Sequence, residues 1–186
     1  CHDAQGVPGR TWEETASALQ DGGFNALFAN MLWAGKAYYP SAVVPVAPDL
    51  AETGDLLAQC LSACRQHDVE LHLWKVCWNL LHAPRSYVET MRRAGRLQQK
   101  ADGSTHPWLC PTDPQNRDLE LSAILEAAQN YDIAGVHLDY IRYPDGDGCY
   151  CDGCRKRFAD DSGLTATNWP SEVVSGPESL LPGSVS

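Results

Sequence analysis

Three ionisable side chains stand at the end of one apolar segment, AGVHLDYIRYP, which spans residues 134–144. The apolar positions predict a buried strand, yet His137, Asp139 and Arg142 carry a charge or can gain one. Because an isolated charge is costly inside a core, the strand ends either in a structural ion-pair network or in a cleft. A carboxylate in a cleft can stabilise or attack a developing oxocarbenium ion. These three are therefore the candidate catalytic residues.

The neighbours of Asp139 bear on both interpretations. Arg142 or Lys75 would hold Asp139 ionised at neutral pH. His137 precedes Asp139 by two positions, so both side chains point to the same face of the strand. A structural interpretation stays open for each: a buried salt bridge between Asp139 and Arg142, and a hydrogen-bonded structural role for His137.

Residues suited to binding sugars follow the ends of all three predicted strands. Tryptophan and tyrosine rings stack on the C–H faces of sugars, while asparagine and lysine donate hydrogen bonds to hydroxyl groups. Packing between strands and helices is the alternative for the tryptophans. The candidate substrate-binding residues are Asn30, Trp33, Lys75, Trp78, Asn79, Tyr140 and Tyr143.

Three of the eight cysteines lie within six residues, in the segment CYCDGC. Cys149, Cys151 and Cys154 could supply three corners of a tetrahedral zinc site, with a histidine or cysteine from elsewhere as the fourth. A local disulfide or reduced thiols that pack the loop would fit the same spacing. The other five cysteines are scattered among apolar neighbours and indicate reduced core cysteines.

Helices and strands alternate along the chain. Hydrophobic periodicity predicts strands over residues 24–33, 69–80 and 133–141, and helices over 11–21, 49–67, 86–94, 118–131 and 151–161. Thr11 and Glu14 have the spacing of a capping box. In the helix over 118–131, we expect the face with Leu121 and Leu125 to be buried.

This alternation predicts an α/β fold with a parallel sheet, and the long loops after the strands favour a (β/α)8 TIM barrel over a doubly wound sheet. A full barrel needs roughly 250 residues. With a further strand ending at residues 1–3, the chain would supply about the first four βα units. We expect a partial barrel domain over 1–170, an irregular tail over 171–186, and a chain that is part of a longer protein.

Composition limits the classes of partner. The chain has 186 residues, 44% of them hydrophobic and 20% charged, with a formal net charge of −10. Such an acidic protein binds polyanions poorly, which argues against nucleic acid as a partner, and no apolar run is long enough to span a membrane. No nucleotide-binding motif is present, and the chemistry above requires no cofactor.

Five segments resemble the Glycosyl hydrolase-like 10 family: NMLWAGKAYYPS, WKVCWNL, PWLCPTDPQNRDLEL, GVHLDYIRYP and CYCDGCRKRF. This resemblance implies a (β/α)-barrel glycoside hydrolase-like protein, with some relatives acting on peptidoglycan glycan strands. It makes Asp139 the expected catalytic carboxylate, with Arg142 and His137 as its partners. A second carboxylate would come from a later strand, outside this sequence. Ile141 stands where chitinases carry their acid glutamate, which argues against chitinase chemistry.

Three functions remain open at this point. The first is a glycoside hydrolase that acts on a bacterial or plant polysaccharide, in a chain that lacks part of its active site. The second is a carbohydrate-binding barrel without catalysis, and the third is a zinc-stabilised interaction module. A glycan-cleaving enzyme is usually exported, so we expect a periplasmic, surface or secreted location.

Overall fold

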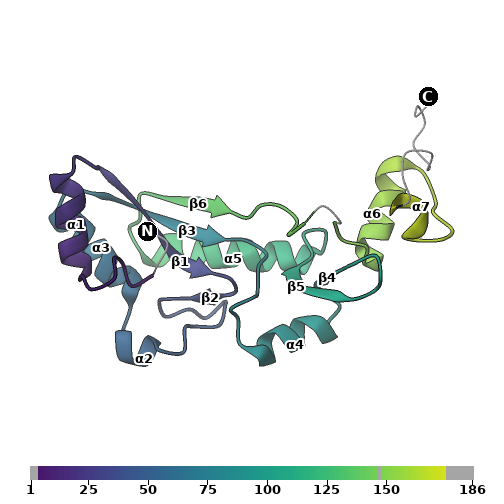
Figure 1. Cartoon of the computed structure of the whole chain (residues 1–186), viewed down its shortest axis with the longest axis horizontal. Coiled ribbons are helices and arrows are strands. Elements are labelled where there is room, and N and C mark those ends of the chain that lie inside the picture. The colour runs from purple at the N-terminus through teal and green to yellow at the C-terminus, as the bar shows by residue number, and fades with distance from the viewer. Residues whose placement is uncertain (1–3, 146–147, 175–186) are drawn as a thin grey trace.

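The computed structural model describes residues 4–145 and 148–174 (Figure 1). Helices and strands alternate along most of this length, as the sequence predicts. The helices are α1 (Trp12–Asp21), α2 (Leu50–Thr53), α3 (Leu56–Gln66), α4 (Arg85–Arg93), α5 (Pro114–Asn130), α6 (Asp152–Ser162) and α7 (Ser171–Val174). The strands are β1 (Ala26–Trp33), β2 (Lys36–Ala37), β3 (Glu70–Val76), β4 (Leu97–Gln99), β5 (Thr105–Leu109) and β6 (Gly135–Asp139).

The main sheet has the order β2-β1-β3-β6. Strands β1, β3 and β6 are parallel, which confirms the predicted parallel sheet, and only the short β2 runs antiparallel to β1. Parallel strands end at the same edge of a sheet, so Trp33, Val76 and Asp139 close three neighbouring strands. The long connections leave from this edge, and the candidate residues gather there.

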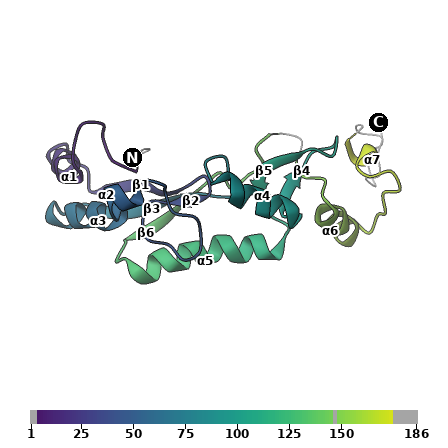
Figure 2. The same cartoon turned by 90° about the horizontal axis from the view of Figure 1, so that it is seen from below.

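The covering helices lie on one face of the sheet. Figure 2 shows α5 running beneath the strands, and α3 and α5 share one core with β3. Leu57 and Cys60 of α3, Ala123 of α5, and Leu71 and Leu73 of β3 are buried in that core. The opposite face carries the half-exposed Phe28. One-sided covering is what the wall of a (β/α) barrel requires, whereas a doubly wound sheet has helices on both faces.

Local signals at the helix ends fold as the sequence indicates, with one exception. Thr11 and Glu14 form the expected capping box on α1. The predicted helix over 49–67 is divided into α2 and α3, because Gly54 adopts a φ of 69° that ends the first helix. The side chain of Asp55 then caps α3 by accepting a hydrogen bond from the Ala58 amide.

A second, two-stranded sheet lies beyond the main one. Strands β4 and β5 pair antiparallel and pack with α4 around Leu80, Met91, Leu97 and Leu109. The sequence does not predict this hairpin, since its strands are short and polar. Figure 1 shows it between the main sheet and α6, which lies with α7 at the far end of the molecule.

The face of α5 beside β6 differs from the prediction. Leu121 is 54% exposed and Leu125 is 45% exposed, while Ala123 and Ala127 are buried against the sheet. Leu138 on the neighbouring strand β6 is 43% exposed. In the described part of the chain, no strand pairs with the outer side of β6, so these leucines form an apolar surface along the edge of the sheet.

Three remaining expectations concern the chain ends and membranes. The predicted strand end at residues 1–3 and positions 175–186 of the predicted tail lie outside the described residues. Residues Ser171–Val174 form α7, where an irregular chain is predicted. Among the described residues, no helix combines the length and the apolar character needed to cross a membrane.

Two leucine-to-alanine substitutions test this arrangement. Leu57 is buried in α3, and Leu57→Ala should lower the free energy of unfolding by about 2–5 kcal/mol, because it leaves a cavity beneath the sheet. Leu125→Ala, the same change on the exposed face of α5, should cost less than about 1 kcal/mol. Urea denaturation measures both values, and equal losses would show that the face of α5 is assigned wrongly.

Candidate active site

The open face of the sheet carries a continuous set of rings. Phe28 of β1, His72 of β3 and Gly135 of β6 are aligned across the sheet, and a Cβ atom on Gly135 would lie 2.6 Å from Nδ1 of His72. Phe28 stacks on His72 at a centroid distance of 4.8 Å and meets His137 edge-on at 5.4 Å. His137 therefore lies on this face, the face that a barrel turns inward.

Asp139 stands at the end of this ring set. Its Oδ2 accepts a hydrogen bond of 3.1 Å from Nε1 of Trp74, and its Oδ1 accepts one of 2.7 Å from the backbone N–H of Tyr140. The Trp74 ring also meets His137 edge-on at 5.9 Å. His137, Trp74 and Asp139 thus share one side of the sheet. Trp74 was not among the residues predicted for the site, although its position one residue before Lys75 places its side chain on the open face.

Tyr140 and Arg142 form a second group beside the carboxylate. The ring of Tyr140 lies 5.6 Å from that of Trp108, and the Arg142 guanidinium carbon lies 4.6 Å from the centre of the Tyr140 ring. Arg142 donates hydrogen bonds to the carbonyls of Tyr143 and Pro144. The guanidinium is thus engaged by Tyr140 and by this loop, and it does not form the salt bridge with Asp139 that the structural alternative required.

Trp33 lies at the end of β1, on the other side of β3 from Asp139. Its ring is 4.6 Å from that of His82, and the Lys36 ammonium lies 5.9 Å from the centre of the Trp33 ring. Leu32 and Leu138 are both aligned with Lys75, so Trp33 and Asp139 stand at the same level. Two strand spacings separate them by about 10 Å.

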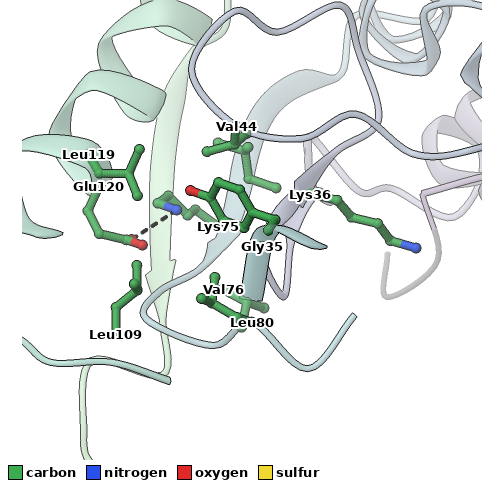
Figure 3. Close-up of a pocket in the computed structure, with 11 residues that line it drawn as sticks. Gly35, Lys36, Val44, Lys75, Val76, Leu80, Leu109, Leu119 and Glu120 are labelled. Carbon is green, nitrogen blue, oxygen red and sulfur yellow. Dashed lines mark ion pairs between the residues drawn. The ribbon is translucent and has the colours of Figure 1, made fainter. Parts of the chain in front are cut away.

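Lys75 faces away from this group. It is 5% exposed and forms a 2.9 Å ion pair with Glu120 of α5, on the helix-covered face of the sheet. Figure 3 shows the two side chains meeting in a narrow pocket lined by Leu109, Leu119 and Val44. The expected contact of Lys75 with Asp139 is therefore not formed, because successive residues of a strand point to opposite faces.

Three more predicted sugar-binding residues are buried or held by other contacts. Trp78 has a φ of 64°, and its ring packs on the core of the β4–β5 hairpin. Its backbone N–H donates a hydrogen bond to Oε1 of Glu120. Asn79 is nearly buried, and its Oδ1 accepts a hydrogen bond from the Leu81 amide. Asn30 is 1% exposed, and neither polar atom of its side chain has a hydrogen-bond partner in the structure.

Four cysteine sulfurs meet at the far end of the β4–β5 hairpin. Cys110, directly after β5, joins Cys149, Cys151 and Cys154, and all four Sγ atoms lie within 4.8 Å of one another. The Sγ of Cys110 is 3.7 Å from that of Cys149, and 3.6 Å from those of Cys151 and Cys154. The interpretation of Cys110 as an isolated core cysteine was wrong. Cys110 lies 39 residues before Cys149, so no short spacing pattern in the sequence links the two cysteines.

The four thiols shift one another's pKa values in opposite directions, because hydrogen bonds within the cluster raise the pKa of Cys149 and Cys154. Hydrogen bonds from the other three thiols, that of Cys149 foremost, lower the pKa of Cys110. The backbone N–H of Gln99 points to Sγ of Cys149 at 3.4 Å, and Cys151 caps α6 at its partially positive end. Tyr143 packs against the cluster, and burial raises its pKa to about 12. Tyr143, one of the predicted sugar-binding residues, thus packs against the cysteines in the loop that follows β6.

Residues 10–156 match the Glycosyl hydrolase-like 10 family. The chain belongs to this family. The match includes every candidate residue of the site and all four clustered cysteines.

A curated relative of this Glycosyl hydrolase-like 10 chain is an S-layer-related protein of Niallia circulans. The two are 32% identical over 81 residues, which is 42% of this chain and 5% of that protein. The chain thus spans a small part of the relative's length.

Two solved glycosidases share the fold. Alpha-L-fucosidase isoenzyme 2 from Paenibacillus thiaminolyticus superposes with a TM-score of 0.64 at 21% identity, over 90% of this chain and 25% of its own. The beta-galactosidase from Marinomonas ef1 gives a TM-score of 0.55 at 13% identity, over 86% and 24%. The chain therefore has the α/β fold of these proteins and spans about a quarter of their length.

The buried ion pair gives a direct test of the position of Lys75. Lys75→Met leaves the carboxylate of Glu120 buried without its charged partner and should lower the free energy of unfolding by about 3–5 kcal/mol. The double variant Lys75→Met/Glu120→Leu should regain most of that loss, because both charges are then gone. Lys156→Met, which breaks an exposed pair with Asp160 on α6, should cost less than about 1 kcal/mol. A stable Lys75→Met protein would contradict the buried position.

Proposed function

We propose that this chain is part of a glycoside hydrolase in which Asp139 is a catalytic carboxylate. The observation that carries the proposal is its position: it ends a parallel strand on the open face, next to aromatic rings. Glycosidases use such a carboxylate to attack or stabilise an oxocarbenium-like transition state. Family membership and the fold shared with two glycosidases support the same reaction class.

Trp74 acts as the positioning residue for this carboxylate. Its indole N–H holds Oδ2, and the Tyr140 amide holds Oδ1, so the orientation of the carboxyl group is fixed by one contact to each oxygen. His137 and Arg142 flank the site as the substrate-contacting partners that the family resemblance implies.

Sugar rings would bind along the same edge of the sheet. The backbone positions of Trp33 and Asp139 stand about 10 Å apart, roughly the length of two sugar units, and the Trp33 ring offers an aromatic surface. Tyr140, backed by Trp108, supplies a second surface beside the carboxylate. Lys75, Trp78 and Asn79 do not contribute, because their contacts hold the fold together.

The reaction needs a second carboxylate, and Glu120 does not provide it. Glu120 lies on the helix-covered face and is bound to Lys75. We assign the second acid to a later barrel strand outside this sequence. The separation of the two carboxyl groups would then decide between retention and inversion.

The substrate class is a bacterial or plant polysaccharide, with peptidoglycan glycan strands as the candidate. The family resemblance points to glycan strands, and the net charge of −10 makes nucleic acid a poor alternative. The S-layer-related protein carries a cell-surface name, which supports an exported or surface location for this chain as well.

A carbohydrate-binding barrel without catalysis is the second candidate function. The engagement of Asp139 by Trp74 and Tyr140 favours it, since both contacts would also serve a purely structural carboxylate. In that case the rings bind sugar and Asp139 anchors the end of β6.

The four cysteines are proposed to hold a structural zinc ion. Four sulfurs around zinc at about 2.3 Å stand about 3.8 Å apart in a tetrahedron, close to the 3.6–3.7 Å between Cys110 and the other three. Four thiolates leave no open position, so the ion would stabilise the fold and take no part in hydrolysis. Zinc would tie the end of β5 to the start of α6.

Substitution of Asp139 separates the two functions. If Asp139 contacts the substrate, Asp139→Asn should weaken binding of peptidoglycan glycan strands by about tenfold or more, because a hydrogen bond to a charged group is lost. Hydrolysis by the 186-residue chain should be slight, since it carries one of two carboxylates. Calorimetry measures binding, and release of reducing ends measures hydrolysis.

Trp33→Ala is the control, because both functions predict that it weakens binding. If Asp139→Asn leaves affinity intact while Trp33→Ala lowers it, the non-catalytic barrel is the function. Rapid hydrolysis that survives Asp139→Asn would remove Asp139 from catalysis.

Metal analysis tests the zinc site. Protein purified without chelators should contain about one zinc ion per chain, and Cys110→Ser should lose it and lower the melting temperature. Cys77→Ser is the matched control: Cys77 is buried outside the cluster, and burial raises its pKa to about 12. A Cys110→Ser protein that keeps its zinc would contradict the four-sulfur site.

A further inference from the structure

The loop that follows Asp139 is attached at two places. Asp139 ends β6 in the main sheet, and Cys149 begins the segment that enters the cysteine cluster. Between them, Tyr140 packs on Trp108 and Tyr143 packs against the cluster. The residues beside the candidate carboxylate are thus continuous with the residues around the metal site.

Tyr140 and Trp108, which contact each other, both lie close in sequence to residues of the cysteine cluster. Trp108 lies two residues before Cys110 on β5, and Tyr140 lies three residues before Tyr143. A metal bound to Cys110 and Cys149 would fix the two chain segments relative to each other. It would thereby set the distance between the two rings that stand beside Asp139.

Tyr140 needs such support, because its backbone is strained. It adopts a φ of 58°, a left-handed conformation that brings the Cβ atom of a non-glycine residue too close to the following carbonyl oxygen. Strained residues persist only where their surroundings over-determine them. Here the surroundings are the Trp108 ring, the Arg142 guanidinium and the hydrogen bond from the Arg142 amide to the Tyr140 carbonyl.

Few other contacts hold the far end of the molecule. Within the described chain, the hydrophobic cluster at this end consists of the buried Cys110, Cys149 and Cys154 with the partly buried Tyr143, Cys151 and Trp169, and Ala166 between α6 and α7 is also buried. Such a small core contributes little hydrophobic stabilisation. Figure 1 shows α6 and α7 set apart from the main sheet, so the cluster is their main attachment.

We propose that metal binding at the four cysteines fixes the conformation of Tyr140 and Arg142 beside Asp139, and thereby controls sugar binding at the open face. This inference rests on the proposed metal centre and on the proposed sugar site. The metal then has two effects at once: it anchors α6, and it completes the binding surface. Metal-free protein would keep its main sheet but lose the ordered Tyr140–Arg142 group.

Hydrogen exchange tests this without a ligand. The amides of Tyr140 and Arg142 are hydrogen-bonded, to Oδ1 of Asp139 and to the Tyr140 carbonyl. Removal of zinc with a chelator should speed their exchange by about tenfold or more, and added zinc should restore protection. Amides of β3 should not change. Cys154→Ala should behave like metal-free protein, whereas Cys60→Ala, in the core beneath the sheet, should keep the protection of Tyr140 and Arg142.

Binding of peptidoglycan glycan strands gives the second measurement. If metal-free protein populates the competent loop about one time in ten, its affinity falls about tenfold. Arg142→Ala should lower affinity similarly while retaining zinc, because it removes a substrate-contacting side chain and leaves the four cysteines in place.

The outcomes separate the three claims. Protein that binds no zinc overturns the metal centre and this inference with it. Zinc binding without any change in exchange at Tyr140 and Arg142 overturns this inference alone. Zinc-dependent exchange in a protein that binds no glycan in any form confirms the coupling of metal and loop, and instead overturns the proposed sugar site.

Discussion

The parallel register of β1, β3 and β6 is the constraint on which the site depends. Helices α3 and α5 cover one face of this sheet, so Leu71, Leu73 and Lys75 of β3 point into the core and the alternate residues point out. The same register brings Trp33 and Asp139 to one level at one edge. A one-residue slip of β6 would turn Asp139 into the core and expose Leu138 in its place. Because α3 and α5 bury one face of the sheet, a ligand such as a sugar would bind on the opposite face.

Much of this arrangement could be predicted from hydrophobic periodicity. The strands, most helices and the capping box at Thr11 follow local patterns, and the charged end of residues 134–144 marked Asp139. The short β4–β5 hairpin was missed because its strands are polar and are held by contacts with α4 and the loop after β3. The group around Asp139 was only partly predicted. Lys75 was misassigned, and Trp74 was left out of the predicted site, because convergence at a strand end was weighed above the alternation of side chains that decides which face each one occupies.

The four-cysteine cluster shows a different limit. Three of its members share a short segment, but Cys110 joins them through tertiary structure alone. Its place is fixed by Asn116, whose Nδ2 donates to the carbonyls of Cys110 and Arg96. Such a ligand has no local pattern, and only the fold identifies it. Once it is placed, the cluster ceases to be a feature of one loop and becomes a connection between β5 and the loop that carries Tyr140.

Two unmet requirements coincide at the outer side of β6. Leu121, Leu125 and Leu138 expose an apolar surface there, which further packed elements would cover. Catalysis by Asp139 requires a second carboxylate across the open face. Strands that continued the sheet beyond β6 would meet both requirements, because each would bury the leucines with its helix and turn its carboxyl end towards Asp139. Packing and chemistry therefore call for the same structure at the same edge, where β6 ends and the loop with Tyr140 and Arg142 begins.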